Sequence, residues 1–303
     1  MHIAISILLI MLFVFLMVHL ILWLYISSSP FSNIVIKPGD QYTSGQRSYV
    51  YPAHLKIQGT VYKLKDEFIE TQRILMKKIA KVFSELKIAW WVSGGTLLGA
   101  TRHGAILPDD DDIDIGTHDE NRSILFSSDF TDTCEKYGLV SMYFLGSSEF
   151  SADRVGGCVR VQVKSGAYCS SCTLDIFFYE TYIFNNIKYM SKIDGWNNNT
   201  NIRNTIETYN HTDVLPLIMT SVDGLQLYLP HKPINLLMRQ YGDDVMEVVH
   251  TRPCLISHAT PYTLFRWIFP SRPRLYREPA ALKANNTWDD HDGGNSDVET
   301  RGK

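Results

Sequence analysis

The chain has 303 residues, of which 45% are hydrophobic and 20% charged, enough to bury the core of one sizeable domain or two small ones. Its formal net charge is only −3. No basic excess is available to neutralise a phosphate backbone, so the composition excludes an ordinary nucleic-acid binder. The acidic residues gather locally instead, which indicates a site.

The first predicted element is a membrane-spanning helix within residues 1–26. Ile3 to Ile26 contain no charged residue and end on the aromatic residues Trp23 and Tyr25. About 20 apolar residues cross a bilayer, whereas a signal peptide has a shorter apolar core that follows basic residues. We therefore expect an uncleaved N-terminal anchor, while the small residues of "ISSSPFS" leave cleavage open.

Two patterns bear on the side of the membrane on which the body lies. The nearest basic residues, Lys37 and Arg47, follow the span, and a positive-inside count would leave the body in the cytosol. Asn-x-Ser/Thr sequons favour a lumenal body instead, and we adopt this prediction. The sequons begin at Asn121, Asn198, Asn210 and Asn285.

Four segments are predicted along the chain. After the anchor, residues 27–58 contain Ser, Pro and Gly without a sustained period, as expected of a stem. Residues 59–280 are predicted to form the folded domain. Residues 281–303 are polar with no apolar period, which predicts a disordered tail.

Within the folded domain, apolar residues recur at steps of three or four from Val61 to Leu86, which predicts a core-facing helix. Ile88 to Val92 reads as a buried strand that ends in a glycine turn, and a short helix is expected to begin at Thr96. Together with the segments below, this order predicts an α+β fold with a mixed sheet and flanking helices. Further strands are expected in "DIDIG", Cys158–Val163 and Thr173–Glu180, and a further helix within Pro230–Met246.

The cysteines fit either a reducing or an oxidising compartment. The motif "CSSC" spans Cys169 to Cys172, with Cys158 upstream, and suits either half of a zinc site or part of a disulfide pair. We expect one or two lumenal disulfides that stabilise the fold, ahead of zinc and well ahead of a thioredoxin-like redox role. The remaining cysteines are Cys134 and Cys254.

The segment "AILPDDDDIDIG", Ala105 to Gly116, contains the strongest chemical signal. Adjacent carboxylates repel one another, so the run is either a solvated loop or the place of a cation. An alternating strand places Asp112 and Asp114 on one face, with isoleucines directed into the core. Two such carboxylates suit Mg²⁺ or Mn²⁺. Asp109 and Asp110 are expected to be mainly solvated.

A phosphate-binding turn is predicted upstream of the aspartates. Glycines between a strand and a helix let phosphate oxygens approach the backbone, and the start of the helix presents N–H groups. Downstream, Asp175 is a lone carboxylate between apolar residues, suited to be a third metal ligand or a base that deprotonates an acceptor. The residues assigned to the donor phosphates are Ser93, Gly94, Gly95, Thr96 and, as a clamp, Arg102.

The stretch "GGTLLGATRHGAILPDDDDIDIG" resembles the signature of the LicD/fukutin family, in which a Gly-Thr-Leu-Leu-Gly segment leads through Arg-His-Gly to Pro-Trp-Asp-Asp-Asp-Ile-Asp-Ile. "LDIFFYE" resembles the second acidic strand of the family, and "VLPLIMTSVDGLQLYLPHKPINLLMRQYG" its closing pattern. Asp109 and Asp244 stand where the family commonly has Trp, which places acceptor or donor packing in question and leaves the metal pair intact.

The resemblance implies a nucleotidyltransferase-like fold and a metal-dependent phosphotransferase. Such an enzyme moves a phosphorylated alditol or phosphocholine from a CDP-linked donor to a hydroxyl of a glycan, on a glycoprotein or a glycolipid, and releases CMP. It further implies residence in the Golgi or ER membrane, where the apolar span and the sequons predict a single-pass type II protein with a lumenal catalytic domain. By position, the glycine turn is Gly94 and Gly95, the metal pair is Asp112 and Asp114, and the third acidic position is Asp175.

Two alternatives remain open. An Asp-x-Asp motif also binds Mn²⁺ and a nucleotide diphosphate in sugar-nucleotide glycosyltransferases, which would differ in using UDP or GDP sugars. A catalytically silent lumenal binding protein of the same fold is the other alternative, and the intact set Asp112, Asp114 and Asp175 speaks against it. The sequence leaves the alditol, the acceptor glycan and the oligomeric state undetermined.

Overall fold

A computed structural model describes residues 11–17, 30–44, 47–144, 158–164, 172–193 and 207–250. Residues 11–17 are helical, and within the described ranges no helix has the length and apolar character needed to cross a bilayer. Most of the predicted anchor and all of the predicted tail lie outside these ranges, so both stay predictions.

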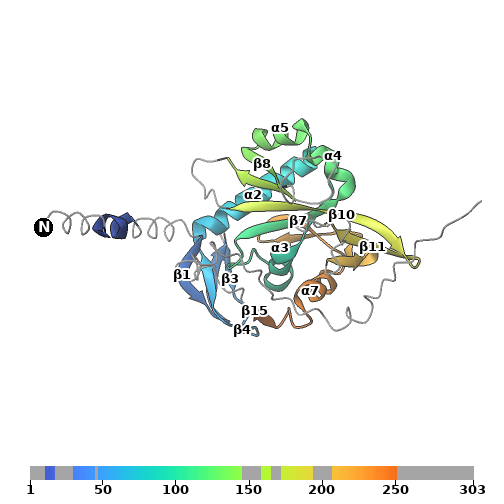
Figure 1. Ribbon diagram of the computed structural model, residues 1–303. Coiled ribbons are helices and arrows are strands. Elements are labelled where there is room, and N and C mark those ends of the chain that lie inside the picture. Colours follow the sequence, from blue (N-terminus) through green and yellow to red (C-terminus); the bar gives the residue numbers. More distant parts are fainter. Residues whose placement is uncertain are drawn as a thin grey trace, which may run out of the picture. The chain divides into compact units, whose positions relative to one another are not determined.

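A mixed sheet forms the centre of the fold, and helices pack around it (Figure 1). Among the described residues this sheet has seven strands, in the order β12–β11–β10–β7–β6, with β9 pairing with β10 and β8 with β9. The predicted α+β class with a mixed sheet is confirmed. The elements run β1 (Phe31–Ile36), β2 (Gln41–Ser44), β3 (Arg47–Val50), β4 (Lys56–Gln58), β5 (Val61–Leu64), α2 (Asp66–Glu85), β6 (Trp90–Val92), α3 (Gly94–Leu98), the π-helix η1 (Gly99–His103), β7 (Asp112–His118), η2 (Asp119–Asn121), α4 (Arg122–Leu125), α5 (Ser128–Lys136), β8 (Leu139–Phe144), β9 (Cys158–Val163), β10 (Thr173–Phe184), β11 (Ile187–Lys192), β12 (Thr208–Asn210), α6 (His211–Val214), β13 (Ile218–Val222), β14 (Leu225–Leu229), α7 (Pro233–Tyr241) and β15 (Val248–His250).

The register of three adjacent strands sets the two faces of the sheet. β7 and β10 are parallel, with Asp114 beside Asp175, and β9 is antiparallel to β10, with Arg160 beside Asp175. Because side chains alternate along a strand, these three charged residues share one face. The other face is apolar and includes Ile113, Ile115, Leu174, Ile176, Val159 and Val161.

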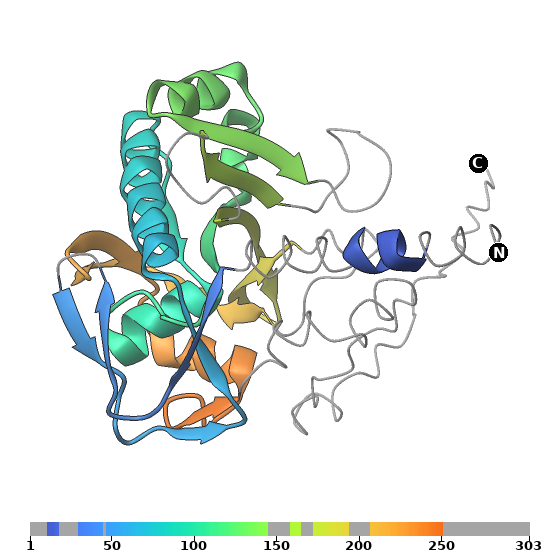
Figure 2. The same ribbon diagram turned by 90° about the vertical axis from the view of Figure 1, so that its left-hand side faces the viewer.

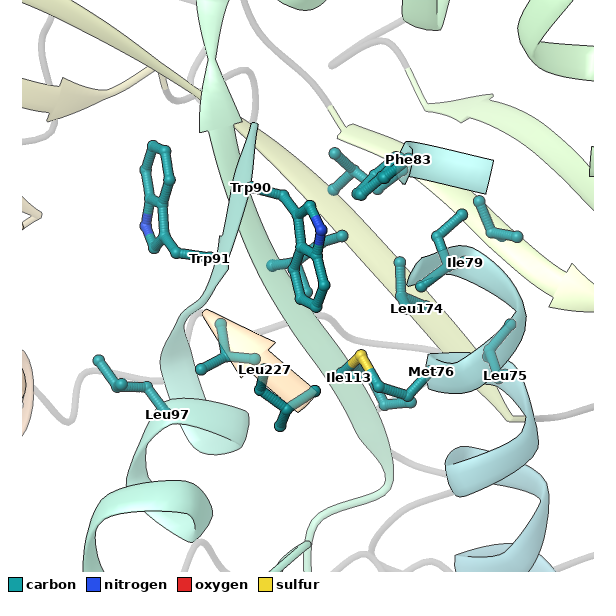
Figure 3. Close-up of a cluster of buried hydrophobic side chains, with 14 of the residues drawn as sticks. Leu75, Met76, Ile79, Phe83, Trp90, Trp91, Leu97, Ile113, Leu174 and Leu227 are labelled. Atoms are coloured by element: carbon teal, nitrogen blue, oxygen red, sulfur yellow. The ribbon is translucent and has the colours of Figure 1, made fainter. Parts of the chain in front are cut away.

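Helix α2 covers the apolar face. Its buried side chains recur with the helical period and meet the sheet, as Figure 3 shows for Leu75, Ile79 and Phe83 against Leu174 and Trp90. Acidic residues in its first turn favour the start of the helix.

The start of α2 differs from the prediction of a helix over residues 61–86. The helix begins at Asp66, because Val61 to Leu64 form β5, which is antiparallel to β1 with Val61 opposite Ile36. Val61 and Leu64 are both buried, and their spacing fits a helix as well as this strand. The pairing with β1 decides between the two.

Residues 31–58 differ from the stem predicted for residues 27–58, because they form four described strands that pack into the body. β4 pairs in parallel with β15, so the blue strand β4 and the orange strand β15 lie side by side in Figure 2. A second apolar cluster closes this region and consists of Ile36, Tyr42, Tyr51, Leu55, Val61 and Val249. Burial of these side chains holds the strands in place.

A buried carboxylate also fastens the β2–β3 hairpin. Asp223 is 2% exposed and accepts hydrogen bonds from Ser44 Oγ, from Tyr49 Oη at 2.6 Å and from Arg73 Nε at 2.9 Å. Arg73 lies on α2, so the hairpin, the helix and the β13–β14 turn share one charged centre. A buried ion pair of this kind needs its other lone pairs satisfied, and the two hydroxyls do so.

Candidate active site

The site begins at Gly94 and Gly95, the first two residues of α3, which follow β6 and Ser93. Gly94 has a φ of +54°, in the left-handed region that favours glycine. A Cβ on Gly94 would lie 2.1 Å from Asp114 Oδ2, and a Cβ on Gly95 would lie 1.9 Å from Asp110 Oδ2. The absent side chains therefore make room for two carboxylates. From the sequence, these glycines are explained by the approach of phosphate oxygens to the backbone. The structure gives a different reason for them, and phosphate binding stays a prediction.

The first residues of β7 are fixed by the same segment. Asp114 N–H donates to Thr96 Oγ1 at 2.9 Å, and Ser93 N–H donates to the carbonyl of Asp114 at 3.0 Å. Asp112 and Asp114 lie on one face of β7, and the buried Ile113 and Ile115 lie on the other. Thr96 thus positions the strand by a side-chain hydrogen bond.

The aspartate loop is more enclosed than predicted. Asp109 and Asp110 are half-buried instead of mainly solvated, and Gln72 Nε2 on α2 donates to the carbonyl of Asp110 at 2.8 Å. Carboxylate oxygens of Asp110, Asp111 and Asp112 all lie within 4.8 Å of one another, close enough to share a metal ion. Asp112 is common to this cluster and to the predicted pair.

Asp175 is buried beside Asp114 and is held by an arginine. Arg160 donates from Nε to Oδ1 and from Nη2 to Oδ2 of Asp175, both at 2.7 Å. This bidentate geometry restricts the carboxylate strongly. Asp175 is 5% exposed, and its role as a third ligand or as a base stays a prediction.

Electrostatics shows that the acidic face suits a cation. Burial, followed by the charge of Asp112, raises the pKa of Asp114 from its ordinary 3.8 to about 7. The negative charges of Asp175 and Glu207 act in the same direction, and Lys192 acts against them. A divalent ion would offset this repulsion, and its hard oxygen ligands are in place, so the residues present fit Mg²⁺ or Mn²⁺.

Arg102, the predicted phosphate clamp, contacts the end of the described chain. Its Nη1 donates to the carbonyls of Val245 at 2.8 Å and Val248 at 3.5 Å. Burial lowers the pKa of this guanidinium. The neighbouring His103 packs edge-on against Tyr51, with ring centroids 4.9 Å apart, and burial lowers its pKa to about 3. Both contacts are structural, and the clamp stays a prediction.

Arg160, Lys192 and Glu207 were not predicted from the sequence. "CVRVQV" contains a usable signal for Arg160, since its alternation places Arg160 on the polar side of β9. Lys192 and Glu207 form an ion pair of 3.0 Å. No local pattern marks them, because their proximity depends on the pairing of β11 with its neighbours.

The predicted cysteine pairing extends beyond the described residues. Cys158 is buried on β9 opposite Phe177, and burial raises the pKa of its thiol to about 12. Cys172 is buried directly before β10. Cys169 and Cys254 lie outside the described ranges, so the disulfide prediction and its zinc alternative stay open.

The fold and the site define an α+β domain with a carboxylate-rich face, whose oxygens fit a divalent cation, beside two glycines. Residues 87–232 match the family model described as LicD/FKTN/FKRP, nucleotidyltransferase domain. This match supports membership of the LicD family and confirms the resemblance found in the motifs. Members of this family are generally transferases.

Two rickettsial relatives are similar to this chain. The uncharacterized protein RP689 of Rickettsia prowazekii (strain Madrid E) is 27% identical over 194 residues, which cover 59% of this chain and 61% of the relative. The uncharacterized protein RT0683 of Rickettsia typhi (strain ATCC VR-144 / Wilmington) is 38% identical over 60 residues, which cover 20% and 19%. The chain thus spans less than two thirds of either relative.

Two solved structures of the antibiotic-resistance factor ANT(2″)-Ia are partly similar. The crystal structure in complex with adenylyl-2″-tobramycin has a TM-score of 0.28 and 16% identity, over 54% of this chain and 73% of that one. The solution structure has a TM-score of 0.27 and 17% identity, over 54% and 69%. A likeness this limited carries no argument about this chain.

Proposed function

We propose that this chain is a metal-dependent phosphotransferase acting on a CDP-linked donor. The group transferred is a phosphorylated alditol or phosphocholine, the acceptor is a hydroxyl of a glycan on a glycoprotein or glycolipid, and CMP is released. The observation that carries the proposal is the packing of the Asp114 and Asp110 carboxylates against Gly94 and Gly95. It gathers acidic ligands beside the turn assigned to the donor phosphates.

The reaction needs a bound diphosphate, an oriented acceptor and a place for one proton. The acceptor O–H gives its proton to Asp175 or a neighbouring carboxylate, and its oxygen attacks the distal phosphorus of the donor. The bond from that phosphorus to the CMP oxygen breaks, and the electron pair leaves with CMP. Arg160 keeps both oxygens of Asp175 oriented.

Asp112 and Asp114 would hold Mg²⁺ or Mn²⁺, and the half-buried Asp110 and Asp111 lie close enough to contribute. When bound, the ion supplies neutralisation of the diphosphate charge. Ser93, Gly94, Gly95 and Thr96 would then lie next to the donor phosphates. Positioning and charge neutralisation supply most of the rate enhancement in such reactions.

The full-length chain is expected to release CMP from CDP-ribitol, CDP-glycerol or CDP-choline when Mn²⁺ and a mixture of glycoprotein glycans are present. Removing the metal with a chelator should abolish the release, because the carboxylates alone repel a diphosphate. The measurement is chromatographic quantification of CMP. Release of UDP or GDP from a sugar nucleotide, with all three CDP donors inert, would favour the glycosyltransferase alternative.

We also propose that the body faces the lumen of the Golgi or ER, tethered by a single N-terminal helix. Two of the sequons lie in the described ranges, and they differ in accessibility. Asn210 is exposed at the end of β12, whereas Asn121 is half-buried and its Nδ2, the atom that would carry a sugar, donates to Thr117 Oγ1 at 2.9 Å. Asn210 is the better glycan acceptor of the two.

Glycosidase digestion of the chain expressed in animal cells should therefore lower its apparent mass. Asn210→Gln should remove part of that shift, and Asn121→Gln should leave it unchanged, as read by gel mobility. An unchanged mass after digestion, together with protease sensitivity in intact microsomes, would place the body in the cytosol.

A further inference from the structure

Lys192 lies beside the acidic face of the sheet. It is paired with Tyr179 across the β10–β11 ladder, so its side chain shares a face with Tyr179, Phe177 and Asp175. Its Nζ lies 3.6 Å from the centroid of the Phe177 ring. Phe177 is two positions along β10 from Asp175, so the ammonium lies over the residue that follows Asp175 on the same face of the strand.

The ion pair with Glu207 leaves Lys192 able to donate a further hydrogen bond. Lys192 Nζ lies 3.0 Å from Oε2 and 3.2 Å from Oε1 of Glu207. An ammonium has three N–H donors, so Lys192 can bind Glu207 and a second anion together. The two side chains are 15% and 10% exposed, and the partial burial strengthens any such contact.

The ion pair is not needed to attach β12 to the sheet. Lys192 N–H already donates to the carbonyl of Glu207 at 3.0 Å, and β11 and β12 are paired from Tyr189 to Ser191. Arg160, another cation on this face, differs in having its guanidinium engaged by both oxygens of Asp175. Lys192 is thus the better placed of these two cations to receive a phosphate.

We propose that Lys192 binds the diphosphate group of a nucleoside diphosphate donor, at the site whose carboxylates face it. The inference deepens the proposed function and rests on it for the identity of the donor. Its chemical basis is charge: a site lined by carboxylates repels a diphosphate, and an ammonium on the same face offers a charge-assisted hydrogen bond.

The proposal predicts that one substitution affects two ligands differently. In Lys192→Gln, affinity for CDP or inorganic pyrophosphate at saturating Mn²⁺ should fall by about 10- to 100-fold, the size of a lost hydrogen bond to a charged group. Affinity for Mn²⁺ alone should be equal or tighter, because a positive charge that repels the ion is gone. Calorimetric titration of the full-length chain measures both.

Two further variants separate this role from a structural one. Lys188→Gln removes an exposed lysine from the same strand and should change neither affinity. Lys192→Gln combined with Glu207→Gln leaves a neutral pair that can still hydrogen-bond, so it should restore any lost melting temperature without restoring CDP affinity.

The proposal is overturned if Lys192→Gln binds CDP with wild-type affinity or loses Mn²⁺ affinity in parallel. It is also overturned if the double variant recovers CDP affinity. The binding readouts need no turnover. If the chain releases no CMP from any CDP-linked donor, but Lys192→Gln weakens pyrophosphate binding without weakening Mn²⁺ binding, the donor assignment fails and the role of Lys192 stands.

Discussion

Asp112→Asn and Asp114→Asn are each expected to remove the stabilisation that Mn²⁺ gives the wild-type chain and to lower CMP release by about 100-fold or more. Asn keeps the shape of Asp and removes one negative charge from the carboxylate cluster. Neither variant should unfold the chain. Burial, followed by the charge of Asp112, raises the pKa of Asp114, and each variant relieves the repulsion between the two carboxylates, so without metal both should melt higher than the wild type. Thermal melting with and without Mn²⁺ measures this.

The same substitution should change how stability depends on pH. The pKa of Asp114 is raised from 3.8 to about 7 in the folded, metal-free chain, so between these values the folded state binds a proton that the unfolded state lacks. Stability from this group is therefore greatest at low pH and is lost as pH rises toward about 7. Asp114→Asn should flatten that slope, whereas the Mn²⁺-induced shift of the wild type should grow with pH.

Two controls locate the ion. Asp109→Asn should leave the Mn²⁺-induced shift largely intact, because Asp109 belongs to neither the predicted pair nor the cluster of three. Asp111→Asn tests the cluster of Asp110, Asp111 and Asp112. If Asp111→Asn loses the shift while Asp114→Asn keeps it, the ion binds to the cluster and the pair of Asp112 and Asp114 is wrong.

Gly94→Ala is expected to be the most damaging small substitution at the site. The left-handed backbone costs a residue with a Cβ about 1 to 2 kcal/mol, and the new methyl group would lie 2.1 Å from Asp114 Oδ2. The carboxylate must move, and a displacement of this order lowers turnover by about 100-fold. Thermal melting and CMP release measure the two parts of the effect.

Gly104→Ala is the matched control. Gly104 has a φ of +65°, and a Cβ there would meet no atom within 4 Å. It should therefore lose about 1 to 2 kcal/mol of stability from the backbone alone, while keeping turnover and the Mn²⁺-induced shift. Equal turnover in both variants would show that the contact between Gly94 and Asp114 has no catalytic consequence.

The strands that carry the site were predictable because their pattern is local. β9 matches the predicted Cys158–Val163, and the predicted Thr173–Glu180 lies within β10, since alternation along one strand reports which face is buried. The helix start at Val61 was wrong because β5 also satisfies a helical spacing, and its partner β1 lies outside any local window. The stem prediction was wrong because β1 and β4 pair with strands that lie far away in the sequence.

The site was partly predictable. The shared face of Asp112 and Asp114 follows from a period of two, but the register that brings Asp175 beside Asp114 depends on the pairing of strands far apart in the sequence. Arg160 and Lys192 become neighbours of the site only through that register. The contact of Gly95 with Asp110 could not be predicted either, because it depends on the path of the loop before β7.

The segment that matches the family model is shorter than the segment that folds as one unit. The family match covers residues 87–232, yet α2, which covers the apolar face, ends before it, and the carbonyls that receive Arg102 follow it. A chain cut to residues 87–232 would lack α2 and expose the core beneath it. It would also lose the carbonyls to which Arg102 of η1 donates. Shared ancestry is detectable where chemistry restricts residue choice, whereas the flanking layers need only apolar residues at suitable spacings. The limits of this domain are therefore better defined by its buried core than by the family match.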